Sequence, residues 1–126
     1  MRATTFRSVA VAVGVGLAMA LASFGAGCAE PFEDAVCPSE GTDLTYDNFG
    51  KRFFQHQCNG CHSVGSEDRR GAPEGVNFDD LDEIHDWTEY IYDRSAGVND
   101  SMPPGPDDPP IEERDDLAEW LACGAP

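Results

Sequence analysis

Three residues near the middle of the chain have the types and spacing needed to bind a haem covalently. Cys58 and Cys61 are separated by two residues, and His62 follows directly, which gives the pattern Cys-x-x-Cys-His. Two thiols at this spacing can reach the two vinyl groups on one porphyrin edge, and the adjacent imidazole can then bind the iron. Because this pattern is the haem c attachment signature, the sequence predicts one covalently bound haem with His62 as an iron ligand.

Three other kinds of site use cysteine, histidine or acidic side chains, and the sequence favours none of them. A thioredoxin-like redox pair requires a βαβ setting, which does not surround Cys58 and Cys61. A zinc site requires a second pair of ligands at zinc-finger spacing, which is absent from the sequence. The acidic residues Asp79, Asp80 and Asp82 lack the glycine and the final glutamate that an EF-hand calcium loop needs.

The first 27 residues have the composition of an export signal. They contain Arg2 and Arg7 but no Asp or Glu, and they are apolar from Val9 to Ala22. A basic start followed by an apolar run is typical of a signal peptide. A retained membrane anchor is the alternative, but glycines interrupt the run and no basic cluster follows it. We expect residues 1–27 to be removed on export to the periplasm.

Cys28 follows this segment and is a candidate for lipidation. Ala26 and Gly27 precede it, as small residues do in a bacterial lipobox, although Gly25 stands where leucine is usual. A lipidated Cys28 would tether the protein to a membrane as a periplasmic lipoprotein. Cleavage after Ala29 is the alternative, and it would release a soluble periplasmic protein.

All the acidic residues lie after residue 27. Six Lys and Arg face 24 Asp and Glu there, so the formal net charge from Cys28 onward is −18. This charge argues against nucleic acid as a partner, because phosphate binding requires positive charge. It favours docking on a basic surface of a partner protein, although an ordinary solvated exterior would have the same composition. We expect one domain at 45–126, preceded by a polar lead-in at 28–44.

Cys37 and Cys123 have no role in haem attachment. In an oxidising compartment two spare cysteines usually form a disulfide, and the loop-closure model gives this long loop a stabilisation of about 4 kcal/mol. Two free or intermolecular thiols are the alternative.

Helix signals predict a helix that leads into the haem motif. Thr45 is its expected N-cap, and phenylalanines at positions 49, 53 and 54 form its apolar side. Gly50 lies inside this helix, where glycine costs about 1 kcal/mol relative to alanine. We therefore expect Gly50 to permit the close approach of another helix.

Two further helices are expected, and no strand. One follows Asp80, which forms a capping pair with Glu83, and its apolar periodicity continues to Ile91. The last begins after Asp108 and ends near Gly124. The segments 63–79 and 95–108 are expected to be loops.

From Thr45 to Cys123 the chain resembles the class I cytochrome c family. The run Gly50-Lys51-Arg52-Phe53-Phe54 matches the family's N-terminal helix, and Trp120-Leu121 matches the aromatic–leucine pair that packs near its glycine. The resemblance implies an all-α, cytochrome c-like fold with three or more helices around one haem. It also implies an electron carrier rather than an enzyme, with redox donor and acceptor proteins as its partners.

The resemblance extends to the remaining iron ligand. In this family a methionine before the last helix usually binds the iron, and Met102 is the only methionine outside the expected signal. His85 is a rival ligand, but we interpret it as a residue on a helix surface. Ligation by histidine and methionine leaves no open position on the iron and favours Fe(II). A proline carbonyl in similar proteins accepts a hydrogen bond from the proximal histidine, which makes Pro73 the candidate here.

Other functions and contacts stay open at this point. A five-coordinate haem would suit a gas sensor or a peroxidase-like protein, and the chain could also be the haem subunit of a larger redox complex. Trp87, Arg69 or Arg70 could bond the haem propionates, and nothing in the sequence selects among them.

Overall fold

The computed structural model describes residues 32 and 35–126. The expected signal and the expected lipidation of Cys28 therefore lie outside the described residues. All the regular elements within the described part are helices. Their order along the chain is η1 (Tyr46–Gly50), α1 (Lys51–Gln57), α2 (Leu81–Asp86), α3 (Thr88–Ser95) and α4 (Ile111–Ala122). None of these helices is long and apolar enough to cross a membrane. The prediction of an all-α fold is confirmed.

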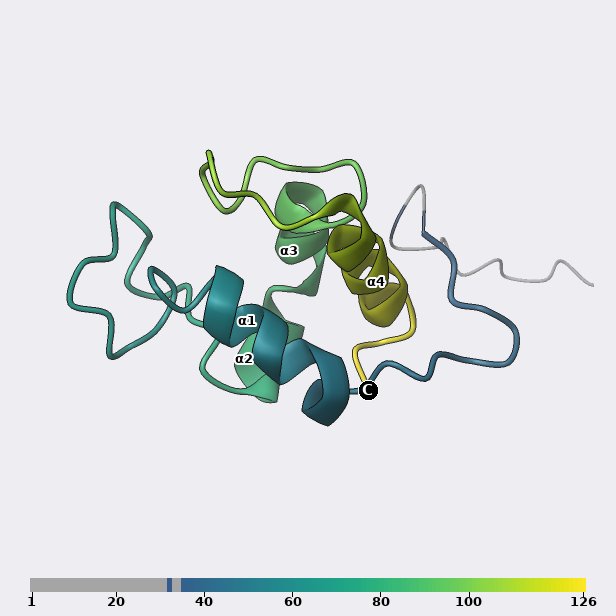
Figure 1. The fold of residues 1–126 in the computed structure, drawn as a ribbon. Helices are drawn as coiled ribbons and strands as arrows, with labels where there is room; N and C mark the ends of the chain where they lie inside the picture. The colour runs from purple at the N-terminus through teal and green to yellow at the C-terminus, as the bar shows by residue number, and fades with distance from the viewer. Residues whose placement is uncertain (1–31, 33–34) are drawn as a thin grey trace, which may run out of the picture.

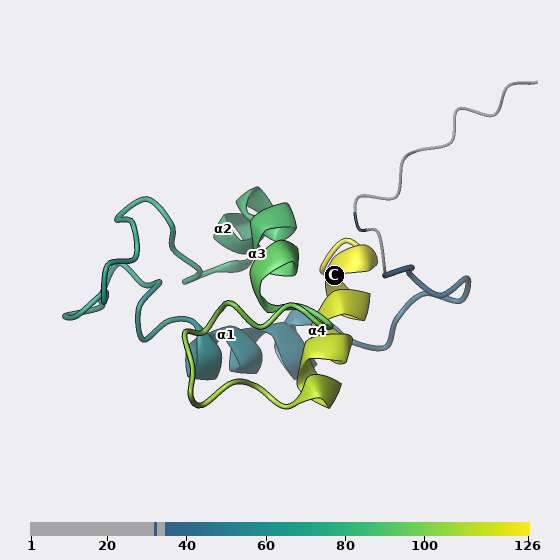
Figure 2. The ribbon, with the colours of Figure 1, turned by 90° about the horizontal axis from the view of Figure 1, so that it is seen from above.

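The helices pack around one apolar core, and long loops connect them. Figures 1 and 2 show the loop after α1 projecting to one side of the helices, while α4 lies at the other side. The core includes Ile84 of α2, Ile91 of α3 and Leu117 of α4, all buried. Each helix therefore contributes one apolar stripe to a shared interior.

Thr45 caps the first helical segment, as the sequence predicts. Its hydroxyl accepts a hydrogen bond from the Asn48 backbone N–H at 3.2 Å, and the Asn48 side chain accepts one from the Thr45 N–H at 2.7 Å. This reciprocal pair is a capping box. The first turn, η1, has π-helical bonding, which the sequence did not reveal, and α1 continues it to the haem motif.

Gly50 lies where η1 meets α1, directly against Trp120 of α4. A Cβ atom placed on Gly50 would lie 2.7 Å from Cζ2 and 2.8 Å from Cη2 of the Trp120 ring. Trp120 is fully buried, and its indole N–H donates to the Pro126 oxygen at 3.2 Å. The expected role of Gly50 in a close helix contact is confirmed, because no larger residue fits beside this ring.

The expected second helix is divided into two at Trp87. α2 ends at Asp86, α3 begins at Thr88, and Trp87 between them has φ −116° and ψ 11°. The Thr88 hydroxyl donates to the carbonyls of Ile84 and His85 at 3.3 and 3.0 Å. Such side-chain bonds compete with regular helical bonding, and periodicity alone did not indicate the break.

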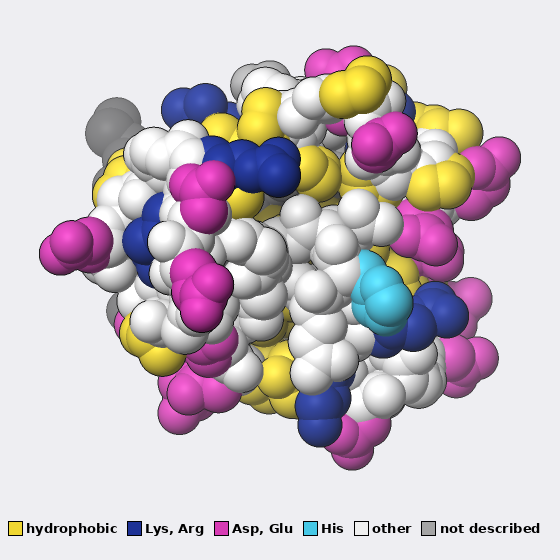
Figure 3. Space-filling model, turned by 60° about the vertical axis from the view of Figure 1, so that its left-hand side comes forward, with side chains coloured by type: hydrophobic (Ala, Val, Ile, Leu, Met, Phe, Trp, Pro, Cys, Tyr) yellow, Lys and Arg dark blue, Asp and Glu magenta, His cyan; other side chains and the backbone are white. Residues whose placement is uncertain are grey.

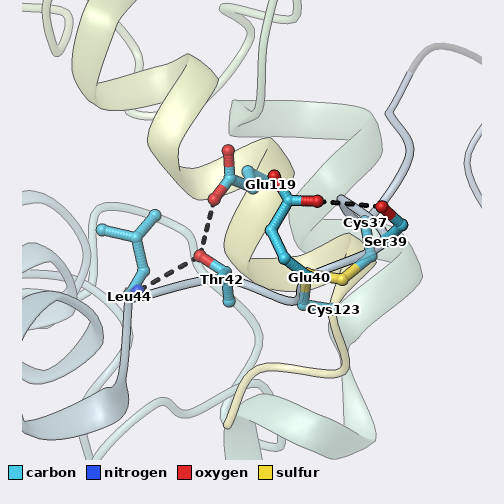
Figure 4. The surroundings of a disulfide bond; sticks show 7 residues. All are labelled: Cys37, Ser39, Glu40, Thr42, Leu44, Glu119 and Cys123. Carbon is cyan, nitrogen blue, oxygen red and sulfur yellow. Dashed lines mark hydrogen bonds between the residues drawn. A yellow bond between two sulfur atoms is a disulfide. The ribbon is translucent and has the colours of Figure 1, made fainter.

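A disulfide joins the lead-in to the end of α4, so the predicted pairing of Cys37 with Cys123 is confirmed. Figure 4 shows a second connection nearby, in which the Thr42 hydroxyl donates to Glu119 at 2.6 Å. The Thr42 hydroxyl also accepts the Leu44 backbone N–H at 3.1 Å. The lead-in is therefore attached to α4 before it enters η1.

We predict that Gly50→Ala lowers the free energy of unfolding by about 1–2 kcal/mol. Overpacking costs about 1–3 kcal/mol, and the better helix propensity of alanine offsets up to about 1 kcal/mol of it. Denaturant unfolding measures the change. Gly75→Ala is the matched control, because a Cβ at Gly75 would meet nothing within 4 Å. Equal stabilities of the two variants would contradict the Gly50–Trp120 packing.

Candidate functional site

A cavity of about 380 Å³ lies between the end of α1, α3 and the loops on either side of them. Cys58, Cys61, His62 and Met102 all contribute to its lining. The rest of the lining is rich in apolar side chains, among them Phe54, Phe78, Trp87, Ile91 and Pro103. The fold thus brings residues 58–62 and Met102 to one largely apolar cavity, although they are distant in sequence.

Backbone hydrogen bonds shape the cysteine motif into a compact turn at the end of α1. The N–H groups of Cys61 and His62 both donate to the Cys58 carbonyl, at 3.0 and 2.9 Å. The Asn59 side chain donates to the Phe78 carbonyl at 3.1 Å. These bonds present Cys58 and Cys61 to the cavity, and neither cysteine belongs to a disulfide.

The Cys58 thiol is not an activated redox thiol. Burial, together with the smaller effect of the neighbouring Cys61, raises its pKa to about 12. Thioredoxin-like motifs lower the pKa of one cysteine instead, and no strand lies in the described residues. Across residues 32 and 35–126, no cluster of three or more His, Cys, Asp or Glu could hold a metal ion. The structure therefore gives no support to the thioredoxin-like, zinc or calcium readings.

The His62 ring is held on two sides. Its Nδ1 lies 3.0 Å from the Val76 carbonyl oxygen, and its ring stacks on Phe78 with centroids 4.9 Å apart. A carbonyl at Nδ1 selects the tautomer in which Nδ1 carries the proton. Nε2 is then left with a lone pair, which is the form of imidazole that binds a metal.

The carbonyl at His62 belongs to Val76 and not to Pro73, which corrects the expectation from the family. The Pro73 carbonyl accepts the Val76 backbone N–H at 3.1 Å and an Arg69 N–H at 2.6 Å. A tight turn at 73–76 therefore uses the Pro73 carbonyl internally and presents that of Val76 to the histidine. Pro73 still lines the cavity.

The loop before α4 places Met102 at the cavity through contacts with α3. The Met102 backbone N–H and the Ser101 hydroxyl both donate to the Arg94 carbonyl, at 2.9 and 3.3 Å.

His85, the rival candidate for the iron, is absent from the cavity lining, and its Nε2 lies 3.1 Å from the Ala125 carbonyl oxygen. His85 is therefore a surface residue in contact with the C-terminal segment.

The sequence offered three residues that could bond the haem propionates, and the structure excludes one of them. Arg69 lines the cavity, but its guanidinium is engaged by the loop at residues 63–77. Arg70 and Trp87 also line the cavity, together with Arg94, which the sequence did not single out. No described contact selects among these three.

The donor set fits a covalently attached haem. Two thiols that form no disulfide, an imidazole with a bonded Nδ1 and a thioether share one largely apolar cavity. Thioether attachment requires the first two groups, and axial binding to iron uses the others.

Comparisons with known proteins agree with this fit. The family model described as "Cytochrome C oxidase, cbb3-type, subunit III" matches residues 48–121, which is more than half of the chain. The matched segment runs from η1 into α4 and contains the cysteine motif and Met102. No curated protein and no solved structure matches the chain significantly.

Proposed function

Because the chain belongs to the cytochrome c oxidase, cbb3-type, subunit III family and so has a c-type cytochrome domain with covalently bound haem c, we propose that it is an electron carrier. In this proposal Cys58 and Cys61 hold the haem, and His62 and Met102 are the axial ligands of its iron.

The shared cavity is the observation that carries this proposal. Met102 lies forty residues after His62 in the sequence, yet both side chains line the same cavity. Met102 is also the only methionine among the described residues. With haem bound, Met102 and His62 would hold the iron through a soft thioether and a neutral imidazole, and this pair of ligands favours Fe(II). Such a site exchanges electrons and binds no substrate at the iron.

The bound haem supplies one-electron chemistry, and the residues around it set the conditions. The Val76 carbonyl keeps the proton of His62 on Nδ1, so that Nε2 is free to bind. Phe54, Phe78 and Ile91 are buried and limit the access of water to the cavity. The protein thereby adjusts the potential through ligand identity, burial and hydrogen bonding.

The acidic exterior supports partners with a basic surface. Figure 3 shows Asp and Glu side chains distributed around one face, with hydrophobic side chains reaching the surface between them. Charge complementarity of this kind accelerates the encounter between proteins. We propose that the redox donor and acceptor dock by this attraction.

The family description favours a second candidate role, as a haem subunit of a larger redox complex. The description names a subunit of an oxidase, and a subunit would use the same haem site to pass electrons inside an assembly. Native electrophoresis of solubilised membranes with haem staining separates the roles. A haem band at the mass of the chain alone favours the free carrier, and a band only at high mass favours the subunit.

We predict that changing either Cys58 or Cys61 to serine weakens haem retention, and that changing both abolishes covalent attachment. Each thiol forms one thioether, so the double variant has none. Haem-stained denaturing gels measure the covalent fraction. The double variant Cys37→Ser/Cys123→Ser is the control, because these cysteines form the disulfide and lie outside the cavity lining. Full staining of the Cys58→Ser/Cys61→Ser variant would contradict the assignment.

We predict that Met102→Leu lowers the reduction potential and allows rapid binding of carbon monoxide to the ferrous protein. Leucine keeps the apolar bulk but removes the sulfur that favours Fe(II). Stopped-flow absorption measures the binding rate. Ser101→Ala, which loses only a loop hydrogen bond, is the control and should behave as the parent. A parent that binds carbon monoxide as fast as Met102→Leu would favour the five-coordinate sensor or peroxidase-like reading.

We also propose export to the periplasm and membrane tethering through a lipidated Cys28. Mass spectrometry of the mature N-terminus should find Cys28 as the first residue, carrying acyl chains, because the preceding small residues resemble a lipobox. Cys28→Ser should release the protein from the membrane. A mature chain that begins at Glu30 would instead show a soluble periplasmic protein.

A further inference from the structure

Arg69 forms the most extensive side-chain network in the described part of the chain. All its bonds stay within the loop that follows the haem motif. Its nitrogens donate at 2.6–3.2 Å to four backbone carbonyls and one side-chain oxygen, those of Ser63, Ala72, Pro73, Val76 and Asn77. A guanidinium has five N–H donors and no acceptor. The five acceptors match this number, so Arg69 has no donor left for a haem propionate.

One of these acceptors is the carbonyl that faces the proximal histidine. The Val76 oxygen accepts an N–H of Arg69 Nη2 at 2.9 Å and lies 3.0 Å from Nδ1 of His62. A carbonyl oxygen has two lone pairs and can accept both donors. Hydrogen bonds from charged donors are the stronger kind. Electron density drawn towards the guanidinium is then less available to the imidazole N–H.

We propose that Arg69 is a positioning residue for the proximal ligand: it acts through the Val76 carbonyl and limits how strongly that carbonyl accepts from the imidazole of His62. The inference rests on the proposed role of His62 as an iron ligand. A strong acceptor at Nδ1 makes the imidazole more basic, and a more basic ligand favours Fe(III) over Fe(II). By weakening this acceptor, Arg69 raises the reduction potential of the haem.

The Val76 carbonyl stays near His62 when Arg69 is replaced, because other bonds fix this segment. The Val76 N–H donates to the Pro73 carbonyl at 3.1 Å, and the Phe78 N–H donates to the His62 carbonyl at 2.8 Å. Phe78 also stacks on the His62 ring. Removing Arg69 should therefore strengthen the bond between His62 and Val76 rather than break it.

The test uses the haem-loaded protein with ¹⁵N-labelled histidine, in the ferrous state. In Arg69→Gln the Nδ1–H resonance of His62 should move downfield, as it does when a hydrogen bond becomes stronger. The ratio of ferrous to ferric protein at a fixed ambient potential should fall about threefold, or about 30 mV at 59 mV per tenfold change. A redox titration measures this second quantity.

Arg70→Gln is the matched control. Arg70 is the next residue and lines the same cavity, but no described bond joins it to Val76. The Arg70→Gln variant removes one charge at the same cavity and leaves the bond between Arg69 and Val76 intact, so it should leave the Nδ1–H resonance in place. The proposal is overturned if Arg69→Gln also leaves this resonance in place, or if both variants shift it equally.

A measurement on the parent protein covers the case in which Arg69→Gln fails to fold. With all five donors bonded, the guanidinium protons of Arg69 should give separate, slowly exchanging resonances. A single averaged and rapidly exchanging signal would overturn the proposal. Rapid binding of carbon monoxide to the parent would refute Met102 ligation only, since the readouts at Arg69 and His62 do not depend on the distal ligand.

Discussion

The contact between Gly50 and Trp120 is the constraint on which the rest of the structure depends. It joins the junction of η1 and α1 to α4 at a separation that only glycine allows. α1 is thereby fixed in direction, and its C-terminal end delivers Cys58 and Cys61 to the cavity. The Trp120 indole holds Pro126 and the disulfide holds Cys37 to the same region. A small domain gains from such links, because its core alone buries limited apolar surface.

Much of the fold could be predicted because its signals are local. Thr45, Gly50 and Asp80 each mark a helix end or a close contact, and the structure uses each of them as expected. The division at Trp87 could not be predicted, because apolar spacing records neither the backbone conformation of Trp87 nor the hydroxyl bonds of Thr88 that accompany the break. The π-helical turn at η1 left no sequence signal either.

The candidate site also has a part that could be predicted from the sequence and a part that could not. The motif at 58–62 is recognisable because its chemistry requires adjacent residues, and the chain's resemblance to a known family was enough to name Met102 as a candidate ligand. The carbonyl that faces His62 could not be named from the sequence, because its identity depends on how the loop at 63–77 folds. That loop turns at Pro73, presents Val76 instead, and is held by Arg69. Backbone carbonyls exist at every residue, so only geometry shows which one faces the ring.

The central claim is that Met102 binds the iron of the haem held by Cys58, Cys61 and His62. The most direct measurement is the proton spectrum of the ferrous protein with ¹³C-methyl-labelled methionine. A thioether bound to haem iron lies over the porphyrin face, so its methyl resonance moves far upfield through the ring current. The account predicts this position for Met102. A Met102 methyl resonance at the ordinary position of an unligated methionine would contradict it.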